Sequence, residues 1–205
     1  MAELSFHYGV MSCGKSTYVL QLRHTLESEG FKPVLVKPSF DTRDEKVIRS
    51  RIGIEFPAHT IGPNEDTHDW LAKWLRLTDG DWTTFTHIIV DEAQFLSDKN
   101  IDGLRKLVDK RDIQVYCFGL RTAYTGRLFD ATAYLMAIAD NLVELPMVYK
   151  DGSKANMHIR YVDGKPIFDG NATFVGDIDE EYESVSRREY FSRREDWTTA
   201  SMASS

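Results

Sequence analysis

The residues best suited to chemistry lie near the amino terminus, in the stretch Gly9-Val10-Met11-Ser12-Cys13-Gly14-Lys15-Ser16. Their spacing matches G-x-x-x-x-G-K-[ST], in which glycines let backbone N–H groups turn inward around phosphates. Lys15 would reach the β- and γ-phosphates of a nucleotide, and the Ser16 hydroxyl would hold Mg²⁺. A strand pattern precedes the stretch and a helical pattern follows it, as a phosphate loop requires. We therefore predict that residues 9–16 bind ATP.

Two acidic residues follow the apolar stretch HIIV. Asp91, at the end of this predicted strand, fits the acid that positions Mg²⁺ together with Ser16 in phosphate-loop enzymes. Glu92 could take a proton from an attacking hydroxyl group or water molecule. The alternative is that both are solvated charges at a strand end, but the phosphate loop upstream favours the metal and base roles. We also expect Ala93 and Gln94 to line the ATP site.

Helical and strand patterns alternate along the first three quarters of the chain. Strand patterns cover residues 3–8, 32–38, 86–92, 113–120 and 141–149. Helical patterns cover residues 16–29, 70–75, 100–112 and 128–140. Strands that alternate with helices and carry continuous apolar runs indicate a parallel sheet covered on both faces. The sequence therefore predicts an α/β fold of the phosphate-loop NTPase type, with a parallel sheet flanked by helices.

The pattern changes after about residue 148. The stretch MHIRYVDGKPIF predicts a β-hairpin with its turn at Asp163-Gly164. The last residues have almost nothing to bury. We therefore predict three parts: a phosphate-loop domain over residues 1–147, a small β-rich domain over residues 148–190, and a flexible tail over residues 191–205.

Composition excludes several classes of protein. The chain has 205 residues, of which 42% are hydrophobic and 28% are charged, so it can bury a core. Its formal net charge of -7 argues against extended nucleic-acid binding, which needs a basic face. No apolar run approaches the roughly 18 residues of a membrane span. Two cysteines, Cys13 and Cys117, give no disulfide framework, so the cytoplasm is the expected compartment.

The two motifs imply Mg-ATP chemistry without naming the acceptor. The letters DEAQ resemble the DEAD and DEAH motifs of helicases. A helicase, however, needs two such domains and a track for nucleic acid, whereas this chain has room for one domain and is acidic. A GTPase would need an N-K-x-D guanine reader, and the sequence contains no such tetrapeptide.

With these motifs in place, the sequence resembles the thymidine kinases of the bacterial, phage and vertebrate-cytosolic type. The resemblance spans residues 1 to about 190 and rests on ordered segments: GVMSCGKST, KPSFDTR, SRIG, VDEAQFL, FGLRTAYTGRLF, LVELPMVY, FVGDIDEEY and SVSRREYF. It implies a phosphate-loop kinase core and a small domain whose loop, the lasso, closes over the base. It also implies thymidine as acceptor, ATP and Mg²⁺, a homotetramer, and feedback inhibition by thymidine triphosphate.

The resemblance also assigns individual residues. Glu92 corresponds to the catalytic base that deprotonates the sugar 5′-hydroxyl, and Ser16 with Asp91 to the magnesium site. The positions that match the nucleoside pocket are Met11, Phe95, Leu120, Tyr124 and Phe129, and those that match the lasso are Val175, Gly176 and Tyr182. A further motif near the site is matched, without individual roles, by Asp41, Thr42 and Arg43.

The residue types support part of this assignment. Tyr124 and Phe129 follow the strand predicted at 113–120, where open parallel sheets bind ligands. With Met11 they would form a flat apolar slot for a pyrimidine and its methyl group, although plain core packing is the alternative for Phe129. Gly176 permits a close backbone approach to the base. A lasso that reads thymine through backbone groups would reject cytosine, because each unpaired group costs about 1–3 kcal/mol.

Two features depart from the family. Asp177 replaces the second glycine of a pair, and the spacing from Gly176 to Tyr182 is longer than usual, which leaves base selectivity open. Bacterial members also carry a structural zinc, whose matched positions here are Tyr149, Asp151, Ser186 and Glu189. Phenol, hydroxyl and carboxylate groups are not the thiolate and imidazole ligands of such a site, and His158 is the only histidine nearby. We therefore expect no structural zinc.

The sequence thus predicts a cytoplasmic thymidine kinase that needs ATP and Mg²⁺, with no nucleic-acid or membrane partner. Within the same class, the alternative is a deoxypyrimidine nucleoside kinase of broader or shifted preference, because the lasso departs from the family. The alternative from another class is an ATP-driven motor of the helicase type. Nucleic-acid-stimulated ATPase activity without nucleoside phosphorylation would favour that alternative.

Overall fold

The computed structural model describes residues 1–39, 47–50, 53–77, 80–170 and 181–203. Within these residues, six strands form one sheet in the order β5-β2-β6-β7-β1-β8. Every neighbouring pair in this sheet runs parallel. The strands are β1 (Leu4–Gly9), β2 (Pro33–Pro38), β5 (His59–Ile61), β6 (His87–Val90), β7 (Gln114–Leu120) and β8 (Asn141–Glu144). The predicted parallel α/β sheet is confirmed.

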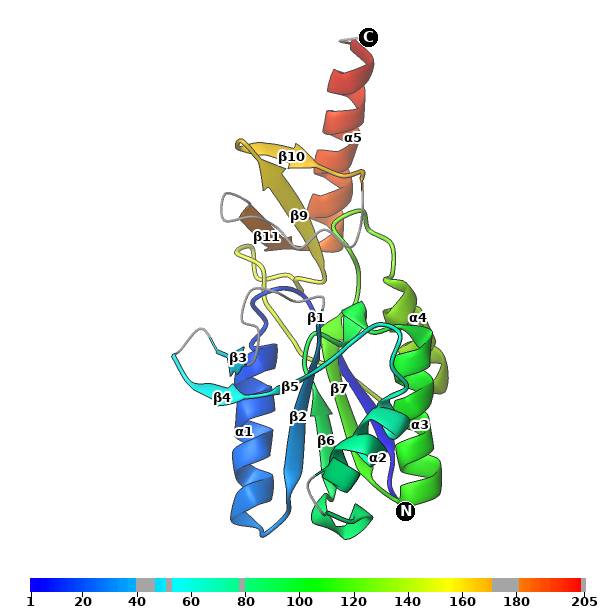
Figure 1. Cartoon of the computed structure of the whole chain (residues 1–205). Helices are drawn as coiled ribbons and strands as arrows, with labels where there is room; N and C mark the ends of the chain where they lie inside the picture. The colour runs from blue at the N-terminus through cyan, green and yellow to red at the C-terminus, as the bar shows by residue number, and fades with distance from the viewer. Residues whose placement is uncertain (40–46, 51–52, 78–79, 171–180, 204–205) are drawn as a thin grey trace.

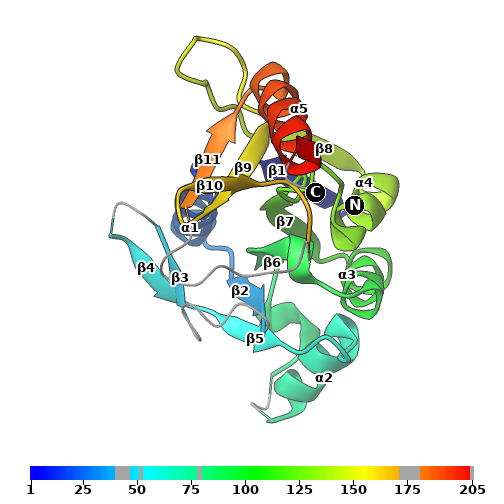
Figure 2. The ribbon, with the colours of Figure 1, turned by 90° about the horizontal axis from the view of Figure 1, so that it is seen from above.

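Helices cover both faces of this sheet. They are α1 (Lys15–Ser28), α2 (Thr67–Leu77), α3 (Asp98–Arg111) and α4 (Asp130–Ile138), with short 3₁₀ turns η1 (Trp82–Thr84) and η2 (Ala93–Phe95). Seen along the strands, α1 lies on one side of the sheet, and α2, α3 and α4 lie on the other (Figure 2). Local sequence sets the helix ends. For example, α3 begins after Ser97, whose hydroxyl accepts the backbone N–H of Asn100 at 3.2 Å.

Successive residues of the central strands supply two cores, one on each side of the sheet. On β6, Ile88 and Val90 belong to the cluster under α2, α3 and α4, whereas Ile89 belongs to the cluster under α1. On β7, Val115 belongs to the cluster under α2, α3 and α4, and Phe118 belongs to the cluster under α1. A strand buried on both faces needs a continuous apolar run, and this is why these strands could be predicted from sequence.

Three short strands between β2 and α2 were missed by the sequence patterns. β3 (Val47–Arg49) and β4 (Glu55–Pro57) pair antiparallel, and β5 joins the edge of the main sheet beside β2. Each of the three contains three residues. A period of two residues cannot be recognised over so short a stretch, so pairing with neighbouring strands rather than local pattern decides these strands.

A second, antiparallel sheet lies beyond the carboxyl ends of β1, β6 and β7 (Figure 1). It contains β9 (Met157–Val162), β10 (Lys165–Ile167) and β11 (Glu181–Val185) in the order β10-β9-β11. The hairpin predicted between β9 and β10 is present. Its turn residues Asp163 and Gly164 have φ of 50° and 71°, and positive φ at both positions is what a two-residue type I′ turn requires.

The last helix, α5 (Arg187–Ala203), packs against this small sheet. The sequence predicted a flexible tail from residue 191; instead, residues 191–203 continue α5 (Figure 1). Trp197 accounts for the difference, because its ring centroid lies 5.8 Å from that of the buried Phe168. The tail therefore partly buries an aromatic side chain, although its composition is mostly polar.

No helix among the described residues is long and apolar enough to cross a membrane.

Candidate active site

The phosphate loop joins β1 to α1, as the sequence predicted. Gly14 adopts φ of 87°, a left-handed conformation that suits glycine, and the space where its Cβ would stand is open. At Gly9 a Cβ would come within 2.5 Å of the Cys13 sulfur. Gly14 therefore allows the turn, and Gly9 allows the loop to pack closely. Helix α1 begins at Lys15 and directs its N-terminal dipole toward the loop.

Lys15 lies folded over the loop. Its ammonium donates to the carbonyl oxygen of Val10 at 2.7 Å and lies 3.8 Å from the Cys13 sulfur, and the residue is only 8% exposed. A buried cation held by a loop carbonyl is ready to exchange that partner for a phosphate oxygen, which binds it more strongly because the oxygen is charged.

Asp91 lies at the carboxyl end of β6, directly beside the loop. Its carboxylate accepts the Ser16 hydroxyl at 3.1 Å and the backbone N–H of Glu92 at 2.9 Å. Burial, and then the negative charge of Glu92, raise the pKa of Asp91 to about 7. Lys15 and Ser16 oppose that rise. A buried carboxylate short of positive charge, next to a hydroxyl oxygen, is a donor set that fits a hard cation such as Mg²⁺.

Glu92 adopts a left-handed backbone conformation, with φ of 53°, just before η2. A residue other than glycine held there is strained, and such strain is frequent at functional sites. Its side chain accepts a hydrogen bond of 2.5 Å from the Gln94 amide. The same Gln94 side chain accepts the backbone N–H of Leu120 at 2.9 Å, so it ties Glu92 to the end of β7.

This arrangement gives Gln94 a contact that sequence reasoning missed. The sequence predicted that Gln94 lines the ATP site, together with Ala93, which is fully buried in the core. No local pattern identifies the link from Gln94 to β7, because Leu120 lies 26 positions further along the chain. The assignment of both residues to ATP binding stays a prediction.

Residues predicted to form the apolar slot pack together beside the phosphate loop. Buried Leu120, Ala123 and Phe129 form one cluster, against which Met11 and Phe95 pack. The rings of Phe95 and Phe129 meet edge to face with centroids 5.9 Å apart. Four of the residues predicted to contact a pyrimidine are therefore in one place, although they come from four different segments: Met11, Phe95, Leu120 and Phe129.

Tyr124 and Tyr182 link this slot to the small sheet. Tyr124 is buried, and its hydroxyl donates to the carbonyl oxygen of Asp169 at 3.2 Å. Tyr182 lies on β11, which is held to the phosphate loop by a hydrogen bond of 2.8 Å from the Ser184 hydroxyl to the carbonyl oxygen of Met11. The remaining predicted residues lie outside the described residues: Asp41, Thr42, Arg43, Val175, Gly176 and Asp177.

The four positions matched to zinc ligands make other contacts. The Asp151 carboxylate accepts the Ser153 backbone N–H at 2.9 Å, and the Ser186 hydroxyl accepts the Glu189 backbone N–H at 3.2 Å at the start of α5. Tyr149 is buried in the core of the small domain, and Glu189 pairs with Arg193 at 2.7 Å. Phenol, hydroxyl and carboxylate oxygens with these protein partners do not fit a structural zinc site, which uses thiolate and imidazole ligands.

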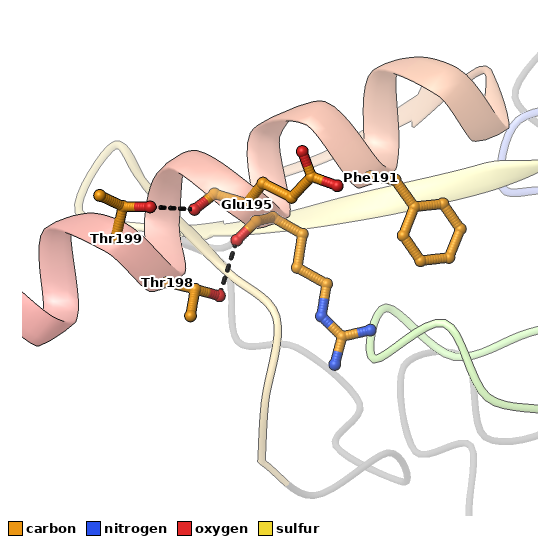
Figure 3. Close-up of a pocket in the computed structure, with 5 residues that line it drawn as sticks. Phe191, Glu195, Thr198 and Thr199 are labelled. Carbon is orange, nitrogen blue, oxygen red and sulfur yellow. Dashed lines mark hydrogen bonds between the residues drawn. The ribbon is translucent and has the colours of Figure 1, made fainter.

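A separate hollow lies along α5 and is lined by Phe191, Arg194, Glu195, Thr198 and Thr199 (Figure 3). The hydroxyls of Thr198 and Thr199 donate to carbonyl oxygens one turn earlier in the same helix, at 2.9 and 3.0 Å. This hollow is on the part of α5 that points away from the main sheet (Figure 1), so it does not belong to the phosphate-loop site.

The fold and the site define a phosphate-loop enzyme, in which a buried aspartate, a partly buried glutamate and an apolar cluster lie beside the loop. A family model described as thymidine kinase matches residues 2–190. The chain is 38% identical to the thymidine kinases of Shewanella oneidensis and of Enterobacteria phage T4, over 93% of this chain and 97% and 96% of theirs. The thymidine kinase of Photobacterium profundum is also 38% identical over the same share of this chain. The chain therefore belongs to the thymidine kinase family.

Proposed function

We propose that the chain transfers the γ-phosphoryl group of ATP to the 5′-hydroxyl of thymidine, giving thymidine monophosphate. Membership of the family makes it an ATP-dependent thymidine kinase. The observation that best supports the site assignment is the position of Glu92. Its backbone N–H is bonded to Asp91 beside the phosphate loop, and its carboxylate is bonded through Gln94 to Leu120 in the apolar slot.

Glu92 acts as the general base. As the oxygen–phosphorus bond to the 5′-hydroxyl forms and the bond to the β–γ bridging oxygen breaks, the hydroxyl proton passes to Glu92 and ADP leaves. Lys15 and the backbone N–H groups of residues 10–16 neutralise charge on the phosphates. Because the phosphoryl group passes through a loose transition state, positioning and charge stabilisation supply most of the rate enhancement.

Ser16 and Asp91 would hold Mg²⁺, which would supply positive charge at the β- and γ-phosphates. The contact of 3.1 Å between the two side chains supports this assignment, as does the raised pKa of the buried Asp91. The Ser16 hydroxyl would then turn from Asp91 toward the cation.

Base selection falls to the apolar slot and to the small domain. Met11, Phe95 and Phe129 offer flat apolar contacts to a pyrimidine ring. Tyr124 and Tyr182 would close the slot from the side of the small sheet, with Val175 and Gly176 as the predicted lasso. Because Asp177 departs from the family pattern, the enzyme could accept a wider set of deoxypyrimidine nucleosides than thymidine alone.

A nucleoside panel tests the proposal. Purified protein is incubated with Mg-ATP and with thymidine, deoxyuridine, deoxycytidine or deoxyadenosine, and the products are separated. Thymidine monophosphate as the main product supports the proposal, and comparable rates with deoxycytidine support the broader preference. ATP hydrolysis that depends on added nucleic acid, with no phosphorylated nucleoside, would replace the proposal with the motor alternative.

We also propose that the small domain holds together without zinc. The observation in support is the set of contacts made by Arg193, which joins two of the positions matched to zinc ligands. Its guanidinium pairs with Glu189 at 2.7 Å and lies 3.4 Å from the Tyr149 hydroxyl. It also pairs with Glu183 on β11 at 2.7 Å and donates to Tyr161 on β9. One cation on α5 thus connects this helix to β9, to β11 and to the segment after β8, which a metal at the four matched positions would otherwise join to the start of α5.

Three further properties follow from the family resemblance. A homotetramer is tested by light scattering. Inhibition by thymidine triphosphate is expected because a base slot and a phosphate loop in one site can hold both ends of that nucleotide. It is tested by competition against ATP and thymidine. A cytoplasmic location is tested by fractionation of the producing cells.

A further inference from the structure

The small sheet has two chemically different faces. On one face, Met157 and Ile159 of β9 and Val185 of β11 belong to the apolar core beside α5. Because side chains alternate along a strand, the residues between them point to the other face. The register places His158 opposite Ser184 and Arg160 opposite Tyr182, so these four share the second face.

This second face meets the phosphate loop and the apolar slot. Ser184 donates to the carbonyl oxygen of Met11 at 2.8 Å, and Arg160 donates to the Tyr124 hydroxyl at 3.3 Å. Met11, Tyr124 and Tyr182 are the predicted nucleoside-contacting residues that the structure places next to the small sheet. The face therefore covers the site proposed for the base.

His158 lies on this face, one residue from the start of β9, and is 2% exposed. Among the described residues, its Nδ1 has no hydrogen-bond partner, and its contact is with the Tyr182 ring, at 6.0 Å between centroids. Burial, and then the positive charge of Lys15, lower the pKa of His158 to about 4. At neutral pH the ring is therefore uncharged, with one N–H donor and one acceptor nitrogen.

A buried polar group without a partner costs stability, and native structures contain few of them. Plain packing would be served better by an apolar ring at this position. A buried ring nitrogen kept without a partner beside a ligand site indicates that the partner arrives with the ligand.

Building on the proposed function, we propose that His158 binds the base by donating a hydrogen bond to a carbonyl oxygen of the bound pyrimidine. The imidazole would approach the ring from the side of the small sheet, between Met11 and Tyr182, whereas the apolar slot holds the faces of the ring. His158 would take no part in the transfer of the phosphoryl group, which occurs at Glu92 and Lys15.

The test compares His158→Phe, which keeps a flat ring without its nitrogens, with His158→Gln, which restores a donor and an acceptor. Thymidine and deoxycytidine binding is measured by calorimetry, and kcat and KM are measured for both nucleosides and for ATP. His158→Phe is expected to weaken thymidine binding about 3- to 10-fold, the effect of one uncharged hydrogen bond, with the KM for ATP unchanged. His158→Gln should recover part of the loss.

Two results would support the inference in different forms. A loss confined to thymidine places the bond at the carbonyl that cytosine lacks, and an equal loss for both nucleosides places it at the carbonyl that they share. Thermal unfolding should show that His158→Phe is as stable as the parent or more so, because a partnerless polar group is removed. The matched control, His24→Phe on the exposed face of α1, should leave binding of both nucleosides unchanged.

Unchanged nucleoside binding by His158→Phe would overturn the inference, as would a loss of kcat alone or of ATP affinity. Calorimetry separates this outcome from failure of the proposed function. A parent protein that binds thymidine without phosphorylating it would contradict the kinase proposal, and the variants would still decide the role of His158. A parent protein that binds no pyrimidine nucleoside would overturn both.

Discussion

The side-chain amide of Gln94 donates a hydrogen bond of 2.5 Å to the carboxylate of Glu92. Gln94 is itself buried and held by the backbone N–H of Leu120 at 2.9 Å. The proposed base is thus positioned from the neighbouring strand β7, whose end also forms the apolar slot. The carboxylates of the adjacent residues Asp91 and Glu92 therefore have different partners. Asp91 accepts a hydrogen bond from Ser16, and Glu92 accepts one from Gln94.

Replacement of Glu92 by glutamine tests the base directly. Glu92→Gln keeps the shape of the side chain and removes its basicity, so we expect kcat to fall about 10²-fold or more. ATP binding and thermal stability should be kept. Steady-state kinetics and nucleotide titration measure these quantities, with Glu29→Gln on the exposed end of α1 as the control. Turnover close to that of the parent would remove Glu92 from this role.

Gln94 should act through Glu92 rather than on its own. Gln94→Leu removes both hydrogen bonds while keeping an apolar stem, and we expect kcat to fall about 10-fold because the carboxylate loses its fixed orientation. In the Glu92→Gln background the same change should have little further effect, since residues that act as a unit are not additive. Equal losses in both backgrounds would show that Gln94 contributes independently.

Lys15 and Ser16 should affect every acceptor alike. Lys15→Ala removes charge stabilisation at the transferred group, and Ser16→Ala weakens binding of Mg²⁺. Both variants should lower kcat for thymidine and deoxycytidine by the same factor, because neither side chain contacts the base. Ser16→Ala should also need a higher Mg²⁺ concentration for half-maximal rate. A changed ratio between the two nucleosides, at an unchanged maximal rate, would contradict the assignment.

The sequence predicted those parts of the fold and site that local pattern determines. The strands β2, β6 and β7 contain continuous apolar runs, and β1 alternates apolar with polar residues. The phosphate loop and Asp91 lie where β1 and β6 end. Asp163 and Gly164 predicted the hairpin turn, because few residues accept positive φ. By contrast, the three-residue strands β3 to β5 and the link from Gln94 to Leu120 depend on pairing across the fold. Such contacts join residues distant in sequence and have no local signal.

The same limit explains the two features of the small domain that sequence reasoning did not reach. Trp197 extends α5 by packing on Phe168, although its neighbours are polar. Arg193 contacts β9, β11 and the segment after β8, and no spacing in the sequence reveals that these come together. The sequence shows that the positions matched to zinc ligands lack cysteine and histidine. It does not show that the Arg193 side chain contacts two of those positions, Tyr149 and Glu189.

Arg193 should stabilise the small domain. Arg193→Met keeps an unbranched apolar stem and removes the hydrogen bonds to Glu183 and Glu189. We expect the free energy of unfolding to fall by about 1–2 kcal/mol. This is less than the loss expected for a fully buried ion pair, because these side chains are partly exposed to solvent. Arg194→Met, on the exposed side of the same helix, is the control and should change little. Chemical unfolding curves measure both.

Metal analysis of the unmodified protein completes this test. We expect zinc well below one equivalent after purification without chelator, and a melting temperature that chelator does not change. Stoichiometric zinc whose removal unfolds the small domain would show that the oxygen donors of Tyr149, Asp151, Ser186 and Glu189 do bind a metal, and the zinc-free proposal would be wrong.

Asp66 should contribute to stability only while it is ionised. Its carboxylate pairs with Lys106 at 2.5 Å and accepts the backbone N–H of His68 at 2.9 Å, joining the start of α2 to α3. Burial alone would raise the pKa of Asp66. The hydrogen bond and positive charge of Lys106, with the backbone N–H groups of His68 and Asp69, outweigh burial and lower this pKa below its ordinary value of 3.8. A carboxylate with a lowered folded-state pKa stabilises the protein above its unfolded-state pKa and loses that contribution as pH falls through the folded-state value.

Asp66→Asn should therefore cost about 1–2 kcal/mol at pH 7, and the difference from the parent should shrink below about pH 4. Urea unfolding of parent and variant across this range measures the difference, with the exposed Asp69→Asn as the matched control. A difference that stays constant down to the acid limit would show that the contribution of Asp66 does not depend on its charge.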